Sequence, residues 1–418
     1  MHHFEYVGDD FCAEAVRLDS IAAAVGTPTY VYSTATLLRH LEAFDAAFAA
    51  RPHLVCYSVK ASSNLAVLHL LGEHGAGMDV VSIGEIHRTR LAGVPGSRVV
   101  FSGVGKQAHE IEAALDADLR MINVESEPEL DLVERVAEHA GKRARIAIRV
   151  NPEVDPRTHP YVATGLQESK FGVTSDLAEA LYARAAASRW LDVVGIDCHI
   201  GSQLVDVEPF VDAVRRVAIL ARKLRDRGIA ISQFDLGGGL GIAYREGTPA
   251  PPHPSEYGKA VLEALDAEGC GDLEVVVEPG RAIVGNSGIL LCRVLHLKRT
   301  PVRTFVVVDA GMNDLVRPAL YGSFHEIRPV RRGVGAPVEV DVVGPVCESG
   351  DFLARGWPLP LPEPGDLLAV MSAGAYGFVM SSTYNSRPRP AEVLVDGARF
   401  RVVRDRETIE DLTRGERI

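Results

Sequence analysis

Short apolar runs alternate with longer amphipathic stretches between residues 53 and 280. The apolar runs have the length of buried strands and lie at residues 53–59, 77–81, 98–103, 121–126, 143–151, 191–200, 233–238 and 273–279. In the stretches between them, apolar residues recur every three or four positions and glycine often follows the last turn, which is typical of helices. Eight alternations of strand and helix close a barrel, so the pattern predicts an α/β fold, a parallel (β/α)8 TIM barrel.

The pattern changes after residue 285, where apolar runs follow one another with few helical stretches between them. The segment 391–403 predicts a hairpin that turns at Asp396-Gly397, and the proline-rich segment 357–365 predicts a loop. We therefore divide the chain into an N-terminal segment (1–30) that packs with a β-rich domain, a barrel (31–284) and the C-terminal β-rich domain itself (285–418).

Composition narrows the choice of partners and compartment. The 418 residues carry a formal net charge of −12, which argues against binding to nucleic acid or to an anionic membrane surface. No run of about 18 apolar residues occurs, so no transmembrane helix is expected. The six cysteines form no C-x-x-C pair and no group with histidine at ligand spacing, so we expect no metal site. Scattered cysteines and the lack of a signal-like N-terminus predict a cytoplasmic protein.

Polar residues follow the predicted barrel strands. Because the chemistry of TIM barrels lies at the carboxyl ends of the strands, we expect these residues to meet on one rim. They are Lys60, Asp79, Ser102, Arg149, His199, the run Gly237-Gly238-Gly239, and Glu278 with Gly280 and Arg281.

Several of these residues allow a structural as well as a functional interpretation. Lys60 is either a solvated charge or a partly desolvated amine of lowered pKa, able to form a Schiff base with an aldehyde. The glycine run is either a tight turn or an anion cradle built from backbone N–H groups. His199 is either a packed histidine or a flat ring that stacks on a cofactor, with the Ser202 hydroxyl reaching a phosphate.

The second domain poses the same choice. Cys347 is either a small buried side chain or a proton donor, and Tyr376 either packs in a loop or contacts a ligand. Arg317 and Tyr321 either pack or recognise a carboxylate, for which a guanidinium group is well suited.

Motifs along nearly the whole chain combine into a resemblance. They are YSVKASSN, THPYVATGLQESKFG (158–172), HIGSQ, DLGGGLGI, VEPGRAIVGNSG (277–288), RPALYGSFH, GPVCESGD and GAYGFVMSSTYNSRPRPAEVLVDG (374–397). In this order they resemble the diaminopimelate decarboxylase family, fold-type III enzymes with an alanine-racemase-like barrel that use pyridoxal 5'-phosphate (PLP).

The resemblance implies a role for each candidate residue. Lys60 is expected to bind the aldehyde of PLP, His199 to stack on its ring and Glu278 to face the ring nitrogen. The phosphate and the rest of the cofactor are expected to contact Asp79, Arg149, Ser202, Gly238, Gly239, Gly280, Arg281 and Tyr376. The amino-acid substrate is expected to contact Arg281, Arg317, Tyr321, Glu348 and Tyr376. Cys347 is the expected proton donor and, with Glu348, enters the site from a partner subunit, which implies a homodimer with shared active sites.

These roles suit decarboxylation. Loss of CO₂ leaves a carbanion for which the PLP ring is the electron sink, and a carboxylate beside the ring nitrogen favours the protonated ring. The implied reaction converts meso-2,6-diaminopimelate to L-lysine and CO₂. Alternatives are a decarboxylase of ornithine, arginine or carboxynorspermidine on the same fold, or a catalytically silent member that acts by binding a protein. A metal-dependent barrel hydrolase is disfavoured because no His/Asp cluster has ligand spacing.

Overall fold

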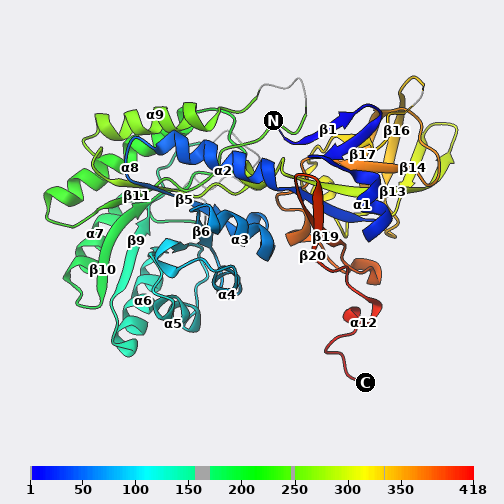
Figure 1. Cartoon of the computed structure of the whole chain (residues 1–418). Coiled ribbons are helices and arrows are strands. Elements are labelled where there is room, and N and C mark those ends of the chain that lie inside the picture. The colour runs from blue at the N-terminus through cyan, green and yellow to red at the C-terminus, as the bar shows by residue number, and fades with distance from the viewer. Residues whose placement is uncertain (1, 156–169, 246–249, 334) are drawn as a thin grey trace. The chain divides into compact units, whose positions relative to one another are not determined.

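The computed structural model describes residues 2–155, 170–245, 250–333 and 335–418, which form two compact units (Figure 1). The barrel unit consists of His40–Ile242 and Pro249–Ala282. The β unit consists of Met1–Arg39, Ala243–Thr248 and Ile283–Ile418. Most of the motif at 158–172, namely residues 158–169, lies outside the described residues.

The barrel unit is built on a closed barrel of parallel strands in the order β10-β11-β12-β5-β6-β7-β8-β9. Its strands are β5 (His53–Ser58), β6 (Gly77–Val80), β7 (Val99–Phe101), β8 (Met121–Val124), β9 (Ala144–Arg149), β10 (Leu191–Asp197), β11 (Gln233–Asp235) and β12 (Glu274–Val277). Each lies within one of the predicted apolar runs. The predicted fold class is thereby confirmed.

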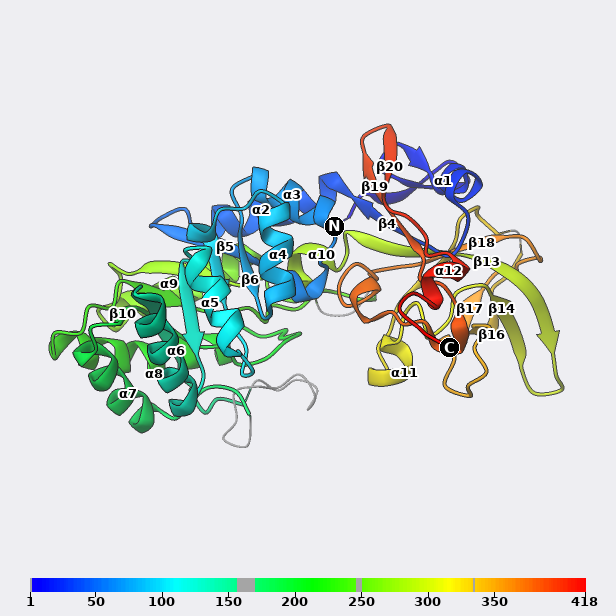
Figure 2. The ribbon, with the colours of Figure 1, turned by 90° about the horizontal axis from the view of Figure 1, so that it is seen from below.

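Helices surround the strands of this barrel, as Figures 1 and 2 show. They are α2 (Thr34–Phe48), α3 (Leu65–Glu73), α4 (Ile83–Leu91), α5 (Ala108–Asp116), α6 (Glu127–Ala140), α7 (Ser175–Ala187), α8 (Glu208–Asp226) and α9 (Pro254–Ala267). Helix α6 illustrates the local signals: the Ser126 side chain caps the Glu129 N–H, and Gly141 ends the helix at a φ of 63°. Within the described ranges, no helix has the length and apolar character needed to cross a membrane.

The barrel interior changes from apolar to polar along its axis. One cluster of buried residues, Cys56, Val100, Met121, Ala147 and Val276, fills part of the interior. The last residues of several strands are instead buried and polar: Ser58, Arg149, Asp197 and Asp235. Buried polar groups need partners, so this end of the barrel is where a functional site is expected.

The β unit contains a large sheet whose main path runs β17-β16-β14-β13-β4-β19-β20, with β18 pairing to β13 and β15. Its strands are β4 (Thr29–Ser33), β13 (Gly288–Arg299), β14 (Thr304–Val308), β15 (Ile327–Pro329), β16 (Val338–Val343), β17 (Phe352–Leu359), β18 (Leu367–Val370), β19 (Ala391–Asp396) and β20 (Arg399–Arg404). A second sheet contains β1 (Phe4–Val7), β2 (Asp10–Ala13) and β3 (Val16–Arg17). The short helices are α1 (Leu18–Val25), α10 (Arg281–Val284), α11 (Arg317–Tyr321) and α12 (Ile409–Leu412).

Two segments differ from the expectation drawn from the sequence. Strand β4 pairs with β13 and β19, so Tyr32 and Ser33 lie in the large sheet, although the barrel domain was expected to begin at 31. Strand β17 continues to Leu359, into the segment predicted to be a loop. Pro358 is tolerated there because β17 is an edge strand, whose outer side needs no N–H donor.

The N-terminal segment shares a hydrophobic core with the large sheet. Phe4, Phe11, Leu18 and Ile21 are buried in one cluster with sheet residues such as Leu291 and Val393. Removing a large apolar side chain from this cluster is therefore expected to destabilise the whole β unit.

We predict that Phe11→Ala, which empties a fully buried position, lowers the free energy of unfolding of the β unit by about 3–5 kcal/mol. The chain has two tryptophans, and Trp357 alone lies in the β unit. Urea unfolding followed by Trp357 fluorescence in a Trp190→Phe background measures the effect. Val7→Ala, at a position that is 67% exposed, is the control. An equal, small effect of both changes would show that the N-terminal segment does not stabilise the unit.

Candidate active site

Lys60 lies directly after β5, in a single helical turn, Val59–Ala61. Its ammonium nitrogen is 2.7 Å from Oδ2 of Asp79, and the Ser58 hydroxyl is 2.7 Å from the same oxygen. Ser58 and Asp79 are register partners in β5 and β6, which explains why these side chains meet. The Asp79 carboxylate is fully buried, whereas the Lys60 side chain is 38% exposed. The amine is thus anchored by a buried charge and can still be reached from solvent.

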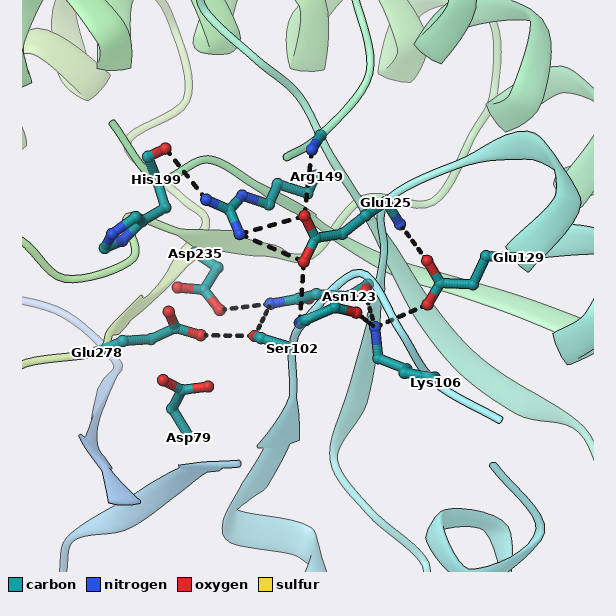
Figure 3. A network of polar contacts seen from close by, with 12 residues as sticks. Asp79, Ser102, Lys106, Asn123, Glu125, Glu129, Arg149, His199, Asp235 and Glu278 are labelled. Atoms are coloured by element: carbon teal, nitrogen blue, oxygen red, sulfur yellow. Dashed lines mark hydrogen bonds and ion pairs between the residues drawn. The ribbon is translucent and has the colours of Figure 1, made fainter. Parts of the chain in front are cut away.

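Glu278 follows β12 and belongs to a chain of buried polar contacts (Figure 3). The Ser102 hydroxyl donates to Glu278 Oε1 at 3.2 Å. The Asn123 amide donates to Ser102 Oγ at 3.2 Å and to Asp235 Oδ2 at 3.3 Å. The end of the barrel therefore links two carboxylates through neutral groups.

This end of the barrel has a surplus of buried carboxylates. Burial, reinforced by the charges of Asp235 and Asp79, raises the pKa of Glu278 well above its usual range, against the opposing effect of Lys60 and Arg149. Burial and Asp197 raise the pKa of Asp235 to about 8. Buried oxygens of Asp79 and Asp197 (Oδ1 of each) accept no hydrogen bond from the described residues. A cationic group beside Glu278 would stabilise its ionised form.

His199 presents a neutral ring in a fixed orientation. Its Nδ1 accepts a hydrogen bond from the Gly238 N–H at 2.9 Å, which places the ring proton on Nε2. Burial lowers the pKa of His199 well below 6.5, and the positive charges of Arg149 and Lys60 lower it further. A neutral, fixed imidazole is suited to stacking on a flat ring.

The run Gly237-Gly238-Gly239 is needed for close packing of the backbone, whether or not it also binds a ligand. A Cβ atom on Gly238 would lie 2.3 Å from the carbonyl oxygen of Glu278, and one on Gly239, at a φ of +117°, would lie 2.5 Å from that of Gly201. The Gly237 N–H donates to Asp235 at 2.9 Å and the Gly238 N–H to His199. Two of the three N–H groups expected to cradle an anion are thus used within the protein.

Arg281 and Ser202 lie together at the same end of the barrel as the glycine run. Arg281 is buried and donates from Nη2 to Ser202 Oγ at 3.1 Å. A Cβ atom on Gly280 would lie 2.9 Å from that of Ser58, so the backbone after β12 passes directly beside the end of β5. An arginine, a hydroxyl and bare backbone are the groups that bind phosphate in barrel enzymes.

These residues fit the predicted cofactor. Lys60 would hold the aldehyde of PLP, His199 its ring face, and Arg281 with Ser202 its phosphate. The acid-rich cluster at Glu278 suits a protonated ring nitrogen, because the pKa of Glu278 stays raised despite the opposing charges of Lys60 and Arg149, and a further cation would stabilise the ionised carboxylate.

Arg149 belongs to a network of buried charged residues that the sequence did not predict. The guanidinium of Arg149 lies 3.3 Å from both carboxylate oxygens of Glu125 and donates to the His199 carbonyl at 3.3 Å. Glu125 in turn donates its N–H to Glu129, which binds Lys106 at 2.7 Å (Figure 3). Glu125 follows β8, so the rule that singled out other strand ends could have found it. Lys106 and Glu129 lie outside the strands and carry no such signal.

The β unit holds the other predicted residues. Arg317 is buried at the start of α11, with its guanidinium carbon 5.9 Å from the Tyr321 ring centre and 6.0 Å from that of Tyr376. These residues, at most 59 positions apart in the chain, therefore gather in one place. Arg317 also contacts Tyr244, Ser323 and His325, which the sequence did not single out.

Cys347 is exposed, unlike the other five cysteines, so the packing interpretation of this residue is wrong. Its N–H donates to Asn385 Oδ1 at 2.7 Å. The preceding Val346 N–H and the Met312 N–H each donate to the Asp351 carboxylate at 2.6 Å. Cys347 and the exposed Glu348 thus lie in a turn that side chains hold from two sides. Asn385 and Asp351 escaped notice, although Asp351 closes the CESGD motif.

Comparison with known proteins places these features in a family. The model for "pyridoxal-dependent decarboxylase, pyridoxal binding domain" matches residues 34–285. The chain is 52% identical to the diaminopimelate decarboxylase of Pseudomonas aeruginosa, over 100% of this chain and 99% of that protein. It is 51% identical to that of Vibrio cholerae, over 99% of this chain and 98% of the relative.

Solved structures agree. Diaminopimelate decarboxylase from Helicobacter pylori, complexed with L-lysine, superposes with a TM-score of 0.91 at 43% identity and covers 95% of this chain and 98% of its own. The enzyme from M. jannaschii, also in complex with L-lysine, gives 0.95 at 36% identity, over 99% and 98%. The chain therefore belongs to the pyridoxal-dependent decarboxylases and, among them, to the diaminopimelate decarboxylase family.

Proposed function

We propose that this chain uses PLP to convert meso-2,6-diaminopimelate to L-lysine and CO₂. The observation that carries the proposal is the acid-rich end of the barrel, where Lys60 binds the buried Asp79 and its charge acts on the pKa of Glu278, beside a neutral His199. Relatives that share about half of the sequence over its full length are diaminopimelate decarboxylases, which supports this substrate.

The cofactor, when bound, supplies an aldehyde for Lys60 and a ring that accepts the electrons released with CO₂. The protein's task is to hold and polarise that ring. Asp79 fixes the Lys60 amine at 2.7 Å, and Glu278 holds a proton at the ring nitrogen. His199 covers a face of the ring with a neutral, half-buried imidazole, which adds no charge there. Gly239, Gly280, Arg281 and Ser202 bind the phosphate.

Cys347 is proposed to return a proton to the carbon that loses CO₂. Its thiol is exposed on a turn fixed by Asp351 and Asn385, so it can be presented to a site outside its own turn. By resemblance to the family, that site is in the partner subunit of a homodimer, and Glu348 enters with it.

The far end of the substrate carries an amine and a carboxylate. Arg281 and Arg317 are proposed to bind the carboxylate, with Tyr321 and Tyr376 beside it, and Glu348 to bind the ammonium. Ornithine offers no second carboxylate, so buried guanidinium groups give no advantage to it.

We also propose that the protein works in the cytoplasm. All six cysteines are free, which supports a reducing compartment.

The test of the substrate is a parallel assay of the holoenzyme with meso-diaminopimelate, ornithine and arginine, with CO₂ release and product identification. We expect L-lysine from diaminopimelate, and a kcat/KM for the other substrates at least about 10- to 100-fold lower, because an unpaired buried guanidinium costs about 1–3 kcal/mol. Equal efficiency with ornithine would contradict the proposed pocket, and no CO₂ release by PLP-loaded protein would identify a silent member of the family.

The shared site can be tested by complementation. Cys347→Ala is expected to retain PLP and to lose about 10²–10⁴-fold in kcat, the usual contribution of a positioned acid. Lys60→Ala is expected to be inactive and to carry no pyridoxyl label after borohydride reduction, whereas a label at another lysine would contradict the assignment of Lys60. Mixing the two variants should restore about a quarter of the wild-type activity, because half of the dimers are hybrids with one intact site. No recovery after subunit exchange is verified would place Lys60 and Cys347 of one chain in the same site.

A further inference from the structure

We infer that His325 is a positioning residue that holds the Arg317 guanidinium in the orientation needed to bind a carboxylate, together with Tyr244 and Ser323. The inference rests on the proposed role of Arg317 in binding the far carboxylate of the substrate. It adds a set of residues that determine specificity without contacting the substrate.

Arg317 is held by hydrogen bonds on two of its nitrogens. Its Nε–H donates to His325 Nε2 at 3.4 Å. Its Nη2 donates to the Tyr244 hydroxyl at 3.1 Å and to the Ser323 hydroxyl at 3.2 Å. Because the guanidinium group is planar, bonds to Nε and Nη2 together fix both its position and the tilt of its plane.

The hydrogen bond that His325 makes through Nδ1 determines that its Nε2 is an acceptor. Nδ1 lies 2.9 Å from the carbonyl oxygen of Met371. A carbonyl oxygen only accepts, so Nδ1 carries a proton and the neutral ring has its lone pair on Nε2. That lone pair is what the Arg317 Nε–H requires. The backbone of Met371, directly after β18, thus determines through the ring how Arg317 is oriented.

Packing keeps the ring in place. His325 is buried, with 1% of its surface exposed. The Tyr244 ring meets it edge-on, with centres 5.4 Å apart and planes at 81°. The same Tyr244 therefore supports Arg317 twice, through its hydroxyl and through the histidine ring, and its ring centre is 5.4 Å from the guanidinium carbon.

Such fixation matters for recognition. A free arginine side chain has many rotamers, and that rotational entropy would have to be lost on each binding event. A guanidinium that is already fixed avoids that loss and meets a carboxylate in one orientation only. We therefore expect His325 to affect the binding of ligands with a far carboxylate and to have little effect on the chemical step.

Two inhibitors separate this role from a structural one. L-lysine retains the carboxylate and the amine of the substrate's far end, whereas cadaverine is the same molecule without the carboxylate. For the PLP-loaded His325→Asn variant we expect the inhibition constant of L-lysine to rise about tenfold and that of cadaverine to change less than about twofold. The KM for meso-diaminopimelate should rise in parallel with the inhibition constant of L-lysine, while kcat stays within about twofold of the wild-type value.

His325→Gln is the matched control. The asparagine amide can replace Nδ1 at Met371 but does not reach Arg317, whereas the glutamine amide oxygen reaches the position of Nε2. Rescue of L-lysine inhibition to within about threefold of wild type by Gln, but not by Asn, is the expected result. Tyr244→Phe, which removes one acceptor and keeps the ring, should shift L-lysine inhibition in the same direction and serves if the Asn variant does not fold.

Arg317→Ala separates the proposed role of Arg317 in binding the carboxylate from the inferred role of His325 in positioning Arg317. If this variant keeps the wild-type preference for L-lysine over cadaverine, the proposed role of Arg317 is wrong, and the inference with it. If Arg317→Ala loses the preference but His325→Asn and Tyr244→Phe retain it, only the inference is overturned. Equal weakening of both inhibitors in His325→Asn would also overturn it, because His325 would then be a purely structural residue.

Discussion

The enclosure of several carboxylates at one end of the barrel is the constraint on which the rest of the site depends. Asp79, Asp197, Asp235 and Glu278 are all buried. Taking carboxylates out of water raises their pKa values, and each charge raises those of its neighbours, as the pKa of about 8 for Asp235 shows. Such a cluster is stable only if cations neutralise it or protons remain on it. Lys60 and Arg149 supply part of the positive charge. In the proposed function, a protonated cofactor ring would supply more at Glu278.

The surrounding groups maintain this charge balance and shape the site. Glu125 holds Arg149 close to His199, where its positive charge helps to keep the imidazole neutral. In the proposed function, a neutral imidazole would add no charge to the cofactor ring and so would not oppose the pairing of that ring with Glu278. In the β unit, the two residues proposed to act on the substrate are also held by neighbours: the Arg317 guanidinium by His325, and the backbone of Cys347 by Asn385.

The sequence predicted those parts of the fold and site that depend on a local pattern of apolar and polar residues. Each barrel strand is an apolar run bounded by polar or glycine residues, so all eight could be located, and the residues just beyond them formed the predicted rim. The last residues of β17 were predicted to be a loop because proline normally signals one, and only the position at a sheet edge makes Pro358 acceptable in a strand. His325 and Asn385 could not be found because their role depends on partners distant in the chain, Met371 and Cys347. Nor could the sequence show that the Gly238 N–H faces His199 rather than an anion.

The most direct test of the charge matching compares two cofactors on two proteins. Dissociation constants are measured for PLP and for its 1-deaza analogue, in which carbon replaces the ring nitrogen, with the wild type and with Glu278→Gln. The account predicts that the wild type prefers PLP by about tenfold or more, since a charge-assisted hydrogen bond is lost with the analogue, and that Glu278→Gln removes most of this preference. The same preference in both proteins would show that Glu278 does not pair with the ring nitrogen, and would contradict the account.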